Sequence, residues 1–516
     1  MADLSTHSYT MATISHKDYQ SKMNDEASSY EQRIRELKTR RNAHADVSSL
    51  PLELLVDIFL LVQKNTPLKD WHRITQVCRH WRDTAINTPI LWTKPPVRHQ
   101  DYTSLMLERS KTSNLYIFLA SLVSTATLVS LSGHIGRIQT LTAFLPVEQL
   151  AELCDRFIAS GHIFSQLESL DVDQSGWQAV DWILPSTLIR QASSLRSVQL
   201  SRVGFDWQML APLNLTSLRL NNIRLTEQIS SRTLLDTLGQ MPRLRHLAFD
   251  LKDLLLRSAP TRPASKFALS QLESLDVEDC SPPHIPFLIS HLVLPRLNCL
   301  KIEMIGVQVV EAYSSNTLAT ITTTIANGNF CVSGSLSVQC GRIRISDSNE
   351  SFVDIRLPGA YVDDHVIGYT RQLLTQIALT LHDLVQVTLV IPLNSDELVQ
   401  IFGNMHRLKA VTIHLYGTLI SALIGALTHF PGHDSPHGAR LFSNLDTVGC
   451  NGFLWDEIDP SVVTDFCNAI LQRANYATAM KTVYFNYRCP PKWAVKLLRD
   501  GGISVKNGEV PEEYGF

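Results

Sequence analysis

Two short stretches place acidic residues beside histidine, a combination that metal ions and hydrolytic reactions can use. Residues 363–365 read Asp-Asp-His, and residues 433–437 read His-Asp-Ser-Pro-His. Neighbouring residues in a chain do not generally point at one centre, and the second stretch lies among Pro and Gly residues typical of loops. We therefore expect both stretches to be solvated loops.

Motifs that carry common enzyme chemistry are absent from the sequence. It contains no Gly-Lys pair for a P-loop, no His-Glu-x-x-His and no Gly-x-Ser-x-Gly. Its Cys and His residues form no group with zinc-binding spacing. The sequence thus predicts no catalytic residue, no metal and no cofactor, and a protein that is not an enzyme.

The amino-acid composition indicates in which cellular compartment the protein is expected and which classes of partner it is not expected to bind. Of the 516 residues, 44% are hydrophobic and 18% are charged, so most of the chain can bury a core. A net charge of −3 provides no overall field for nucleic acid or an anionic membrane. The nine cysteines include no Cys-x-x-Cys pair and are typical of reduced thiols. We expect a cytoplasmic or nuclear protein, or one present in both compartments, that binds no nucleic acid.

One segment has the low charge of a membrane span. Residues 112–136 contain no Asp, Glu, Lys or Arg, but five Ser and Thr residues interrupt the apolar part, 115–131. A spanning helix needs about 20 predominantly apolar residues. We therefore expect a buried strand at 115–119 followed by a helix, and no contact with a membrane. Residues 1–30 are polar, so no secretory signal is expected either.

The N-terminal part divides where the composition changes. Residues 1–29 lack periodicity and predict a disordered tail. Residues 30–46 predict a leader helix, because Tyr30, Ile34 and Leu37 recur at helical spacing. We expect this helix to pack on the residues that follow; a short coiled coil and a nuclear-import element are the alternatives.

Residues 47–93 predict a unit of three short helices. Pro67 and Pro89 end helices, and residues 52–63 form the first one. Its apolar positions, at helical spacing, are Leu54, Leu55, Ile58, Phe59 and Val62. The unit holds more large apolar side chains than so small a fold can enclose, so we expect it to bind a partner.

Three blocks of residues in this unit stand in a characteristic order. They are Leu50-Pro51-x-Glu53-Leu54-Leu55-x-x-Ile58-Phe59, Val77-Cys78-Arg79-x-Trp81-Arg82, and Leu91-Trp92. In order and spacing they resemble the F-box motif, although the polar connection at 63–67 is longer than is usual there. With the leucine-rich sequence that follows, the chain is similar to fungal F-box proteins.

This resemblance implies a set of partners. An F-box docks on a Skp-family adaptor, which links it to a cullin and a RING subunit. The residues expected to face or support the adaptor are Leu50, Pro51, Leu54, Ile58, Val77, Cys78, Trp81, Leu91 and Trp92.

Residues 94–500 carry a degenerate L-x-x-L-x-L pattern. It starts at Leu167, Leu195, Leu215, Leu244, Leu272, Leu297, Leu384, Leu408 and Leu445, with weaker copies from Ile138 and Met480. Such a pattern favours short strands that share one core, as in leucine-rich repeats. The pattern fails at about 303–383, where we expect an irregular insert, formed either by divergent repeats or by an added hairpin. Residues 501–516 predict a C-terminal tail. The predicted fold class is α/β: a helical F-box unit followed by an irregular leucine-rich-repeat-like solenoid.

Three functions follow from this organisation. The first is the substrate receptor of a Skp-cullin-F-box (SCF) ubiquitin ligase, which directs an unknown target protein to ubiquitin-dependent degradation. The second is a leucine-rich-repeat scaffold whose F-box serves assembly without ubiquitylation. The third, an enzyme that uses His365 or His437, predicts bound metal and fits the sequence least.

Overall fold

The computed structural model describes residues 16–67, 70–120, 122–175, 182–210, 213–225, 229–250, 266–280, 284–304, 315–327, 330, 334–346, 352–357, 364–378, 381, 383–414, 417–428, 442–476 and 480–510. The chain forms two compact units, Met1–Thr140 and Leu141–Phe516. The elements of the first are α1 (His16–Ala43), η1 (Asp46–Ser49), α2 (Leu52–Asn65), η2 (Trp71–Gln76), α3 (Arg79–Ile86), η3 (Pro89–Trp92), α4 (Gln100–Arg109), β1 (Leu115–Leu119), α5 (Thr125–Ser132) and η4 (Ile135–Arg137). Strand β2 (Ile138–Leu145) runs across the division.

The first helix differs from its prediction in length and in packing. It begins at His16, so the part of the predicted disordered tail that is described is helical. Its early residues include Lys, Gln, Met, Glu and Ala, which are good helix formers and outweigh the lack of periodicity. None of its residues is buried, so the expected packing on the residues that follow is wrong for the described part of the chain.

A single apolar cluster holds the helices of the first unit together. Its buried members come from α2, η2, α3, η3 and α4. They are Leu55, Phe59, Trp71, Ile74, Ala85, Leu91, Trp92 and Met106. Because Met106 lies on α4, the core of the helical unit reaches past residue 93, the boundary expected from the sequence.

The segment checked as a membrane span forms a strand and a short helix, as expected. Strand β1 alternates buried and exposed residues, and Ser124 caps the start of α5, since its Oγ accepts a hydrogen bond from Thr127 N–H at 3.2 Å. In the described residues no helix is both long and apolar enough to cross a bilayer.

The second unit is built on a large, mostly parallel sheet. Its strands are β3 (Ser169–Gln174), β4 (Ser197–Ser201), β5 (Gly204–Phe205), β6 (Ser217–Asn221), β7 (Arg224–Leu225), β8 (His246–Asp250), β9 (Phe267–Ala268), β10 (Ser274–Cys280), β11 (Leu292–Val293), β12 (Cys299–Met304), β13 (Ser335–Gln339), β14 (Arg342–Ser346), β15 (Phe352–Arg356), β16 (Gln386–Val390), β17 (Ala410–His414), β18 (Thr447–Asn451), β19 (Thr482–Asn486) and β20 (Ser504–Asn507). In the sheet the order is β3-β4-β6-β8-β10-β12-β15-β14-β13-β16-β17-β18-β19-β20, and β5–β7 and β9–β11 form two small separate pairs.

The L-x-x-L-x-L positions set the register of these strands. Leu170 pairs with Val198, Val198 with Leu218, and Leu247 with Leu275. Each first leucine of the pattern, just before its strand, is at most 1% exposed. The alternating apolar residues therefore align from strand to strand and form one continuous buried layer.

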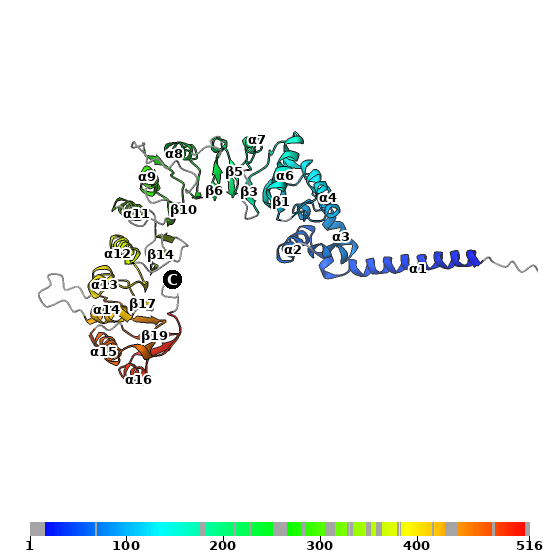
Figure 1. Ribbon diagram of the computed structural model, residues 1–516. Helices are drawn as coiled ribbons and strands as arrows, with labels where there is room; N and C mark the ends of the chain where they lie inside the picture. Colours follow the sequence, from blue (N-terminus) through cyan, green and yellow to red (C-terminus); the bar gives the residue numbers. More distant parts are fainter. Residues whose placement is uncertain are drawn as a thin grey trace, which may run out of the picture. The chain divides into compact units, whose positions relative to one another are not determined.

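Helices cover one face of this sheet. They are α6 (Val147–Ala159), α7 (Ser186–Arg190), η5 (Trp207–Met209), α8 (Ser231–Gly239), α9 (His284–His291), α11 (Ser315–Asn327), α12 (Asp364–Ala378), α13 (Ser395–Phe402), α14 (Gly417–Thr428), η6 (Trp455–Glu457), α15 (Pro460–Tyr476) and α16 (Lys492–Asp500). From α11 to α16 each helix packs against the next, and in Figure 1 they follow one another along the same side of the strands.

The region where the repeat pattern fails contains one inverted strand. β15 runs parallel to β12, and β13 runs parallel to β16. Strand β14 lies between β15 and β13 and is antiparallel to both. Two strands thus continue the parallel sheet, and the extra one turns back between them.

The C-terminal tail predicted at 501–516 includes a strand. β20 pairs in parallel with β19, and Ile503 just before it is buried. This strand, Ser-Val-Lys-Asn, lacks the leucine pattern, so the sequence alone did not indicate it. Residues 511–516 lie outside the described residues.

Candidate interaction surface of the N-terminal helices

The core of the helical unit is closed by aromatic side chains. The rings of Trp71 and Trp92 meet edge to face with their centroids 5.2 Å apart, and Phe59 meets Trp81 in the same way at 5.1 Å. Trp92 Nε1 donates a hydrogen bond to the carbonyl oxygen of Ala85 at 2.8 Å. The Arg109 guanidinium lies 4.5 Å from the Trp92 ring centroid. These contacts fill the interior without any contribution from the outer apolar side chains.

A second apolar stripe on α2 is exposed. Leu54 is 51% exposed and Leu61 58%, and Ile58 between them is half-buried. These residues follow one another at i, i+4 and i+7, whereas the buried Leu55 and Phe59 lie about 100° further round the helix. Helix α2 therefore has two apolar faces, of which only one is used inside the unit.

More exposed apolar side chains lie outside α2. Val77, at the end of η2, is 58% exposed, and Ile90 in η3 is 51% exposed. Leu52, at the start of α2, is also more than half exposed. Neighbouring Cys78 starts α3, since its Sγ accepts the backbone N–H of Trp81 at 3.4 Å. We name the set Leu52, Leu54, Ile58, Leu61, Val77 and Ile90 the apolar surface.

The structure sorts the nine residues predicted to face or support an adaptor into three groups. Pro51, Leu54 and Val77 are exposed. Leu50, Ile58, Cys78 and Trp81 are half-buried, and Leu91 and Trp92 are fully buried core residues. Helical spacing left open whether Leu54 shares the buried face with Leu55, and the structure places Leu55 in the core and Leu54 at the surface. Leu61 was missed, although its position seven residues after Leu54 was a usable signal.

The sheet face opposite the helices carries a row of polar residues. Paired strands place Asp171, Gln199, Arg219, Ala248, Asp276, Lys301, Asp354 and Arg344 at one level. Lys301 Nζ lies 3.3 Å from Asp276 Oδ2 and also contacts Glu278. Burial raises the pKa of Asp276, an effect that Lys301 opposes. Ala248 is the one apolar residue at this level, and we name the other seven the polar row.

The inverted strand adds a buried ion pair to this row. Arg342 donates two hydrogen bonds to the Asp354 carboxylate, from Nε at 2.8 Å and from Nη2 at 2.6 Å. Asp354 is 5% exposed, and Arg356 lies on its other side with Nη2 3.8 Å from Oδ2. Two-point pairing of this kind fixes the orientation of both groups. Strand β14 is thus locked to β15 through its side chains as well as its backbone.

The acidic and histidine stretches form no site in the described residues. Asp364 and His365 open α12 and are exposed, and residues 429–441, which include the second stretch, lie outside the described residues. No cluster of His, Cys, Asp or Glu in the described part of the chain has the geometry to hold a metal ion.

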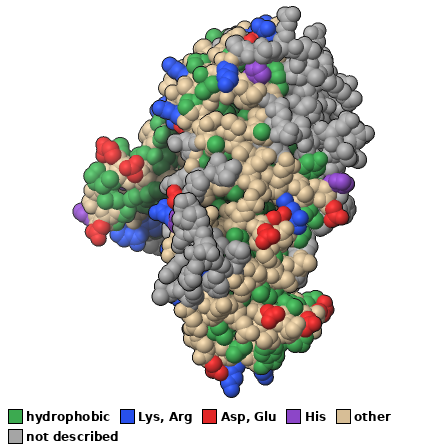
Figure 2. All heavy atoms as spheres, turned by 90° about the vertical axis from the view of Figure 1, so that its left-hand side faces the viewer, with side chains coloured by type: hydrophobic (Ala, Val, Ile, Leu, Met, Phe, Trp, Pro, Cys, Tyr) green, Lys and Arg blue, Asp and Glu red, His purple; other side chains and the backbone are tan. Residues whose placement is uncertain are grey.

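The face in Figure 2 shows Lys and Arg interspersed with Asp and Glu and no broad basic field.

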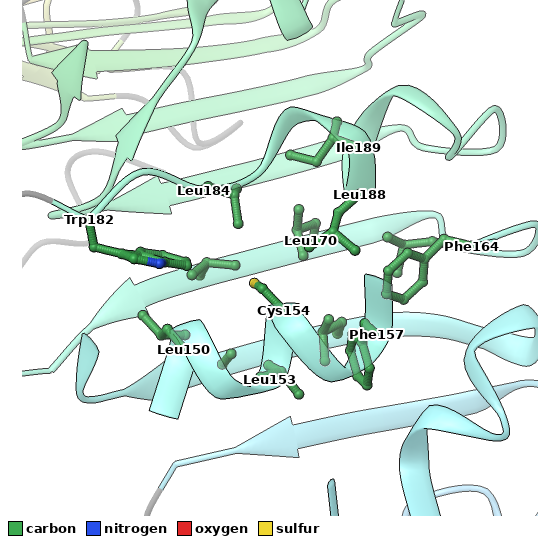
Figure 3. Close-up of a pocket in the computed structure, with 14 residues that line it drawn as sticks. Leu150, Leu153, Cys154, Phe157, Phe164, Leu170, Trp182, Leu184, Leu188 and Ile189 are labelled. Carbon is green, nitrogen blue, oxygen red and sulfur yellow. The ribbon is translucent and has the colours of Figure 1, made fainter. Parts of the chain in front are cut away.

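An apolar cavity lies between α6, β3 and α7 (Figure 3). Its volume is about 30 Å³, and its lining includes Leu150, Cys154, Phe157 and Trp182. A ligand pocket for a small organic molecule needs about ten times this volume. The cavity is therefore a packing void.

Buried thiols in the second unit give a prediction on reactivity. Burial raises the pKa of Cys154 to about 12 and that of Cys467 to about 11, whereas Cys489 is exposed. The thiolate is the reactive form. At mildly alkaline pH we expect a maleimide to label Cys489 in the folded chain and Cys154 and Cys467 only after unfolding, as measured by peptide mass spectrometry. Rapid labelling of Cys154 in the folded chain would contradict this burial.

The buried thiols also determine how the stability of the folded chain changes with pH. An unfolded thiol ionises near its ordinary pKa of 9.0, whereas folded Cys154 stays protonated to about pH 12. The stabilisation from the neutral buried thiol is therefore complete below about pH 9 and is lost as the pH rises toward 12. Denaturant midpoints measured across this range should fall, and Cys154→Ala should flatten the decline.

Comparison with known proteins finds a family match for the helices that follow α1. Residues 47–96 match the F-box-like family. A search of curated proteins finds no match for the chain. The matched residues cover α2, η2, α3 and η3, the elements that bear the apolar surface. F-box domains generally bind Skp-family adaptors, so the match suggests adaptor binding and a role in substrate recognition. Residues 47–96 are therefore an F-box-like domain.

Proposed function

We propose that this protein is the substrate-recognition subunit of an SCF ubiquitin ligase. The observation that carries the proposal is the apolar surface on an F-box-like domain whose own core is already full. Leu54, Leu61 and Val77 are each more than half exposed, and large apolar side chains left exposed on so small a domain support a protein interface there. The adaptor covers this surface and connects the chain to a cullin and a RING subunit.

The second unit holds the target protein in this proposal. Its strands form a leucine-rich-repeat-like solenoid. A backbone hydrogen bond just before the strand, which recurs from one repeat to the next, supports this arrangement. Arg196 N–H donates to Glu168 O at 2.8 Å, Thr216 N–H to Arg196 O at 2.7 Å, and Arg245 N–H to Thr216 O at 2.8 Å. The polar row presents both signs of charge on the face without helices, and a target with complementary charges binds there.

The chain contributes proximity and performs no covalent chemistry. Holding a target beside a ubiquitin-conjugating enzyme raises the effective concentration of the target lysines near the activated ubiquitin. No cofactor or metal takes part. Seven described cysteines are free of disulfides, which suits the cytoplasm or the nucleus.

A reconstituted reaction separates this function from the assembly scaffold. With adaptor, cullin, RING subunit, activating and conjugating enzymes present, we expect ubiquitin on the chain itself or on a protein bound to its second unit, read by mass spectrometry. The matched control is the chain with Leu54→Asp and Leu61→Asp, which should gain none. Adaptor binding without any ubiquitin transfer would support the scaffold and contradict the ligase.

A further inference from the structure

Helix α1 is long and exposed. It spans His16–Ala43, and no residue along these 28 positions is buried. Helices in proteins gain most of their stability by packing an apolar face, and α1 packs none. Its intrahelical ion pairs, such as Arg35 with Glu31 at 3.2 Å, are fully solvated and add little. The helix therefore has an unused face.

This face has the spacing of a coiled-coil seam. Met23, Ala27, Tyr30, Ile34 and Leu37 alternate at intervals of four and three residues. Two helices that repeat apolar residues in this way wind around each other with the seam at their contact. Tyr30, Ile34 and Leu37 are each at least half exposed, so the seam is accessible to a second helix.

The charges along α1 differ between its two ends. Residues 16–31 hold two basic and four acidic residues, a net charge of −2. Residues 32–43 hold five basic residues and one acidic, a net charge of +4. Two copies side by side in the same direction would place the basic ends together. Two copies in opposite directions place each acidic end against a basic end.

The charged residues that flank the seam also favour the antiparallel orientation. In a parallel pair, Glu26 of one copy would face Glu31 of the other, and Arg33 would face Lys38. Both contacts join like charges. In an antiparallel pair with its two-fold axis between residues 28 and 29, Glu26 faces Arg33 of the second copy, and this attractive contact occurs twice.

The antiparallel register also packs the seam. Met23 lies opposite Ile34 of the second copy, Ala27 lies opposite Tyr30, and Leu37 lies opposite Gln20, so four of the five seam residues meet another seam residue. An unfavourable contact between Lys17 and Lys38 also occurs twice, but it falls at the two outer ends, where solvent screens it. No other antiparallel register of this seam pairs Glu26 with Arg33.

We propose that α1 pairs with α1 of a second copy of this chain as an antiparallel coiled coil. The two F-box-like domains leave the coiled coil at opposite ends. With a rise of about 1.5 Å per residue, the two copies of Ala43 stand about 40 Å apart along its axis. One particle then presents two adaptor-docking surfaces. This pairing is independent of whether the adaptor binds.

The test is the dimerisation of the full chain, measured by sedimentation equilibrium over a range of concentrations. The wild-type chain should form a dimer. Ile34→Asp should abolish it by charging the seam. A chain that stays monomeric to its highest soluble concentration, or a dimer that survives Ile34→Asp, would overturn the proposal.

One charge reversal decides the orientation. Glu26→Arg places two arginines together in the antiparallel pair and should weaken the dimer about tenfold, whereas in a parallel pair it would face Glu31 and strengthen the dimer. Adding Arg33→Glu should restore the wild-type affinity. The matched control is Asp25→Arg, the same change in charge on the side away from the seam, which should leave the dimer unchanged. A stronger dimer with Glu26→Arg alone would refute the antiparallel pairing.

Discussion

We expect that replacing Leu54 and Leu61 with Asp lowers the affinity for a Skp-family adaptor about a thousandfold or more, while the chain stays folded. Both side chains are more than half exposed in the free protein, so the substitutions remove little internal packing. In the proposed complex they would become buried, and a central apolar anchor contributes about 2 kcal/mol or more. Two such losses correspond to about a thousandfold, and burying two carboxylates adds a further cost.

The affinity is measured by isothermal titration calorimetry, with circular dichroism as the check on folding. The control carries Leu122→Asp and Ile163→Asp, which change two other exposed apolar side chains outside the F-box-like domain. This control should bind as tightly as the wild-type chain. Unchanged affinity in the Leu54 and Leu61 variant would place the adaptor on another surface.

Replacing Trp92 with Ala destabilises the first unit by about 3 to 5 kcal/mol. The side chain is 1% exposed and packs against Trp71, so its removal leaves a large cavity. The carbonyl oxygen of Ala85 also loses the hydrogen bond from Nε1. Trp92→Phe keeps most of the packing and should cost much less.

Hydrogen exchange followed by mass spectrometry gives the stability of each unit separately. Protection should fall in residues 52–109 of the Trp92→Ala chain and remain unchanged in the second unit. The control is Trp493→Ala, because Trp493 is 44% exposed on α16 and its loss leaves no cavity in a core. Equal protection in wild type and Trp92→Ala would show that the cluster around Trp71 does not hold the unit together. The two variants also separate roles: we expect Trp92 to act through folding, and Leu54 and Leu61 to act through contact with the adaptor.

Local patterns in the sequence predict the elements of both units. The L-x-x-L-x-L copies that begin at Leu167, Leu195 and Leu215 became β3, β4 and β6. This succeeds because alternation with period two fixes both the strand and its buried face within a few residues. Pro67 likewise lies in the connection between α2 and η2, and Pro89 is the first residue of η3. The order of the F-box blocks is equally local, which is why the family match fell on nearly the predicted residues.

What the sequence left open or did not predict is information that a single local pattern does not contain. Leu54 and Leu55 are the same residue type, and only the three-dimensional packing shows that one is core and the other surface. The reversal of β14 depends on pairing with β13 and β15, and its alternation alone gives no direction. Strand β20 forms because β19 offers an edge, since its own sequence is polar. Sequence patterns therefore predict which segments form elements better than which surfaces remain open.

The most direct test of the account is whether the wild-type chain binds a Skp-family adaptor at all. Size-exclusion chromatography with light scattering measures the mass of the mixture, and comparison with the Leu54→Asp, Leu61→Asp chain gives the background. The account predicts a complex with one adaptor for each copy of the chain, which the variant does not form. A folded wild-type chain that elutes separately from the adaptor would contradict the proposed docking, and with it the ubiquitin-ligase function.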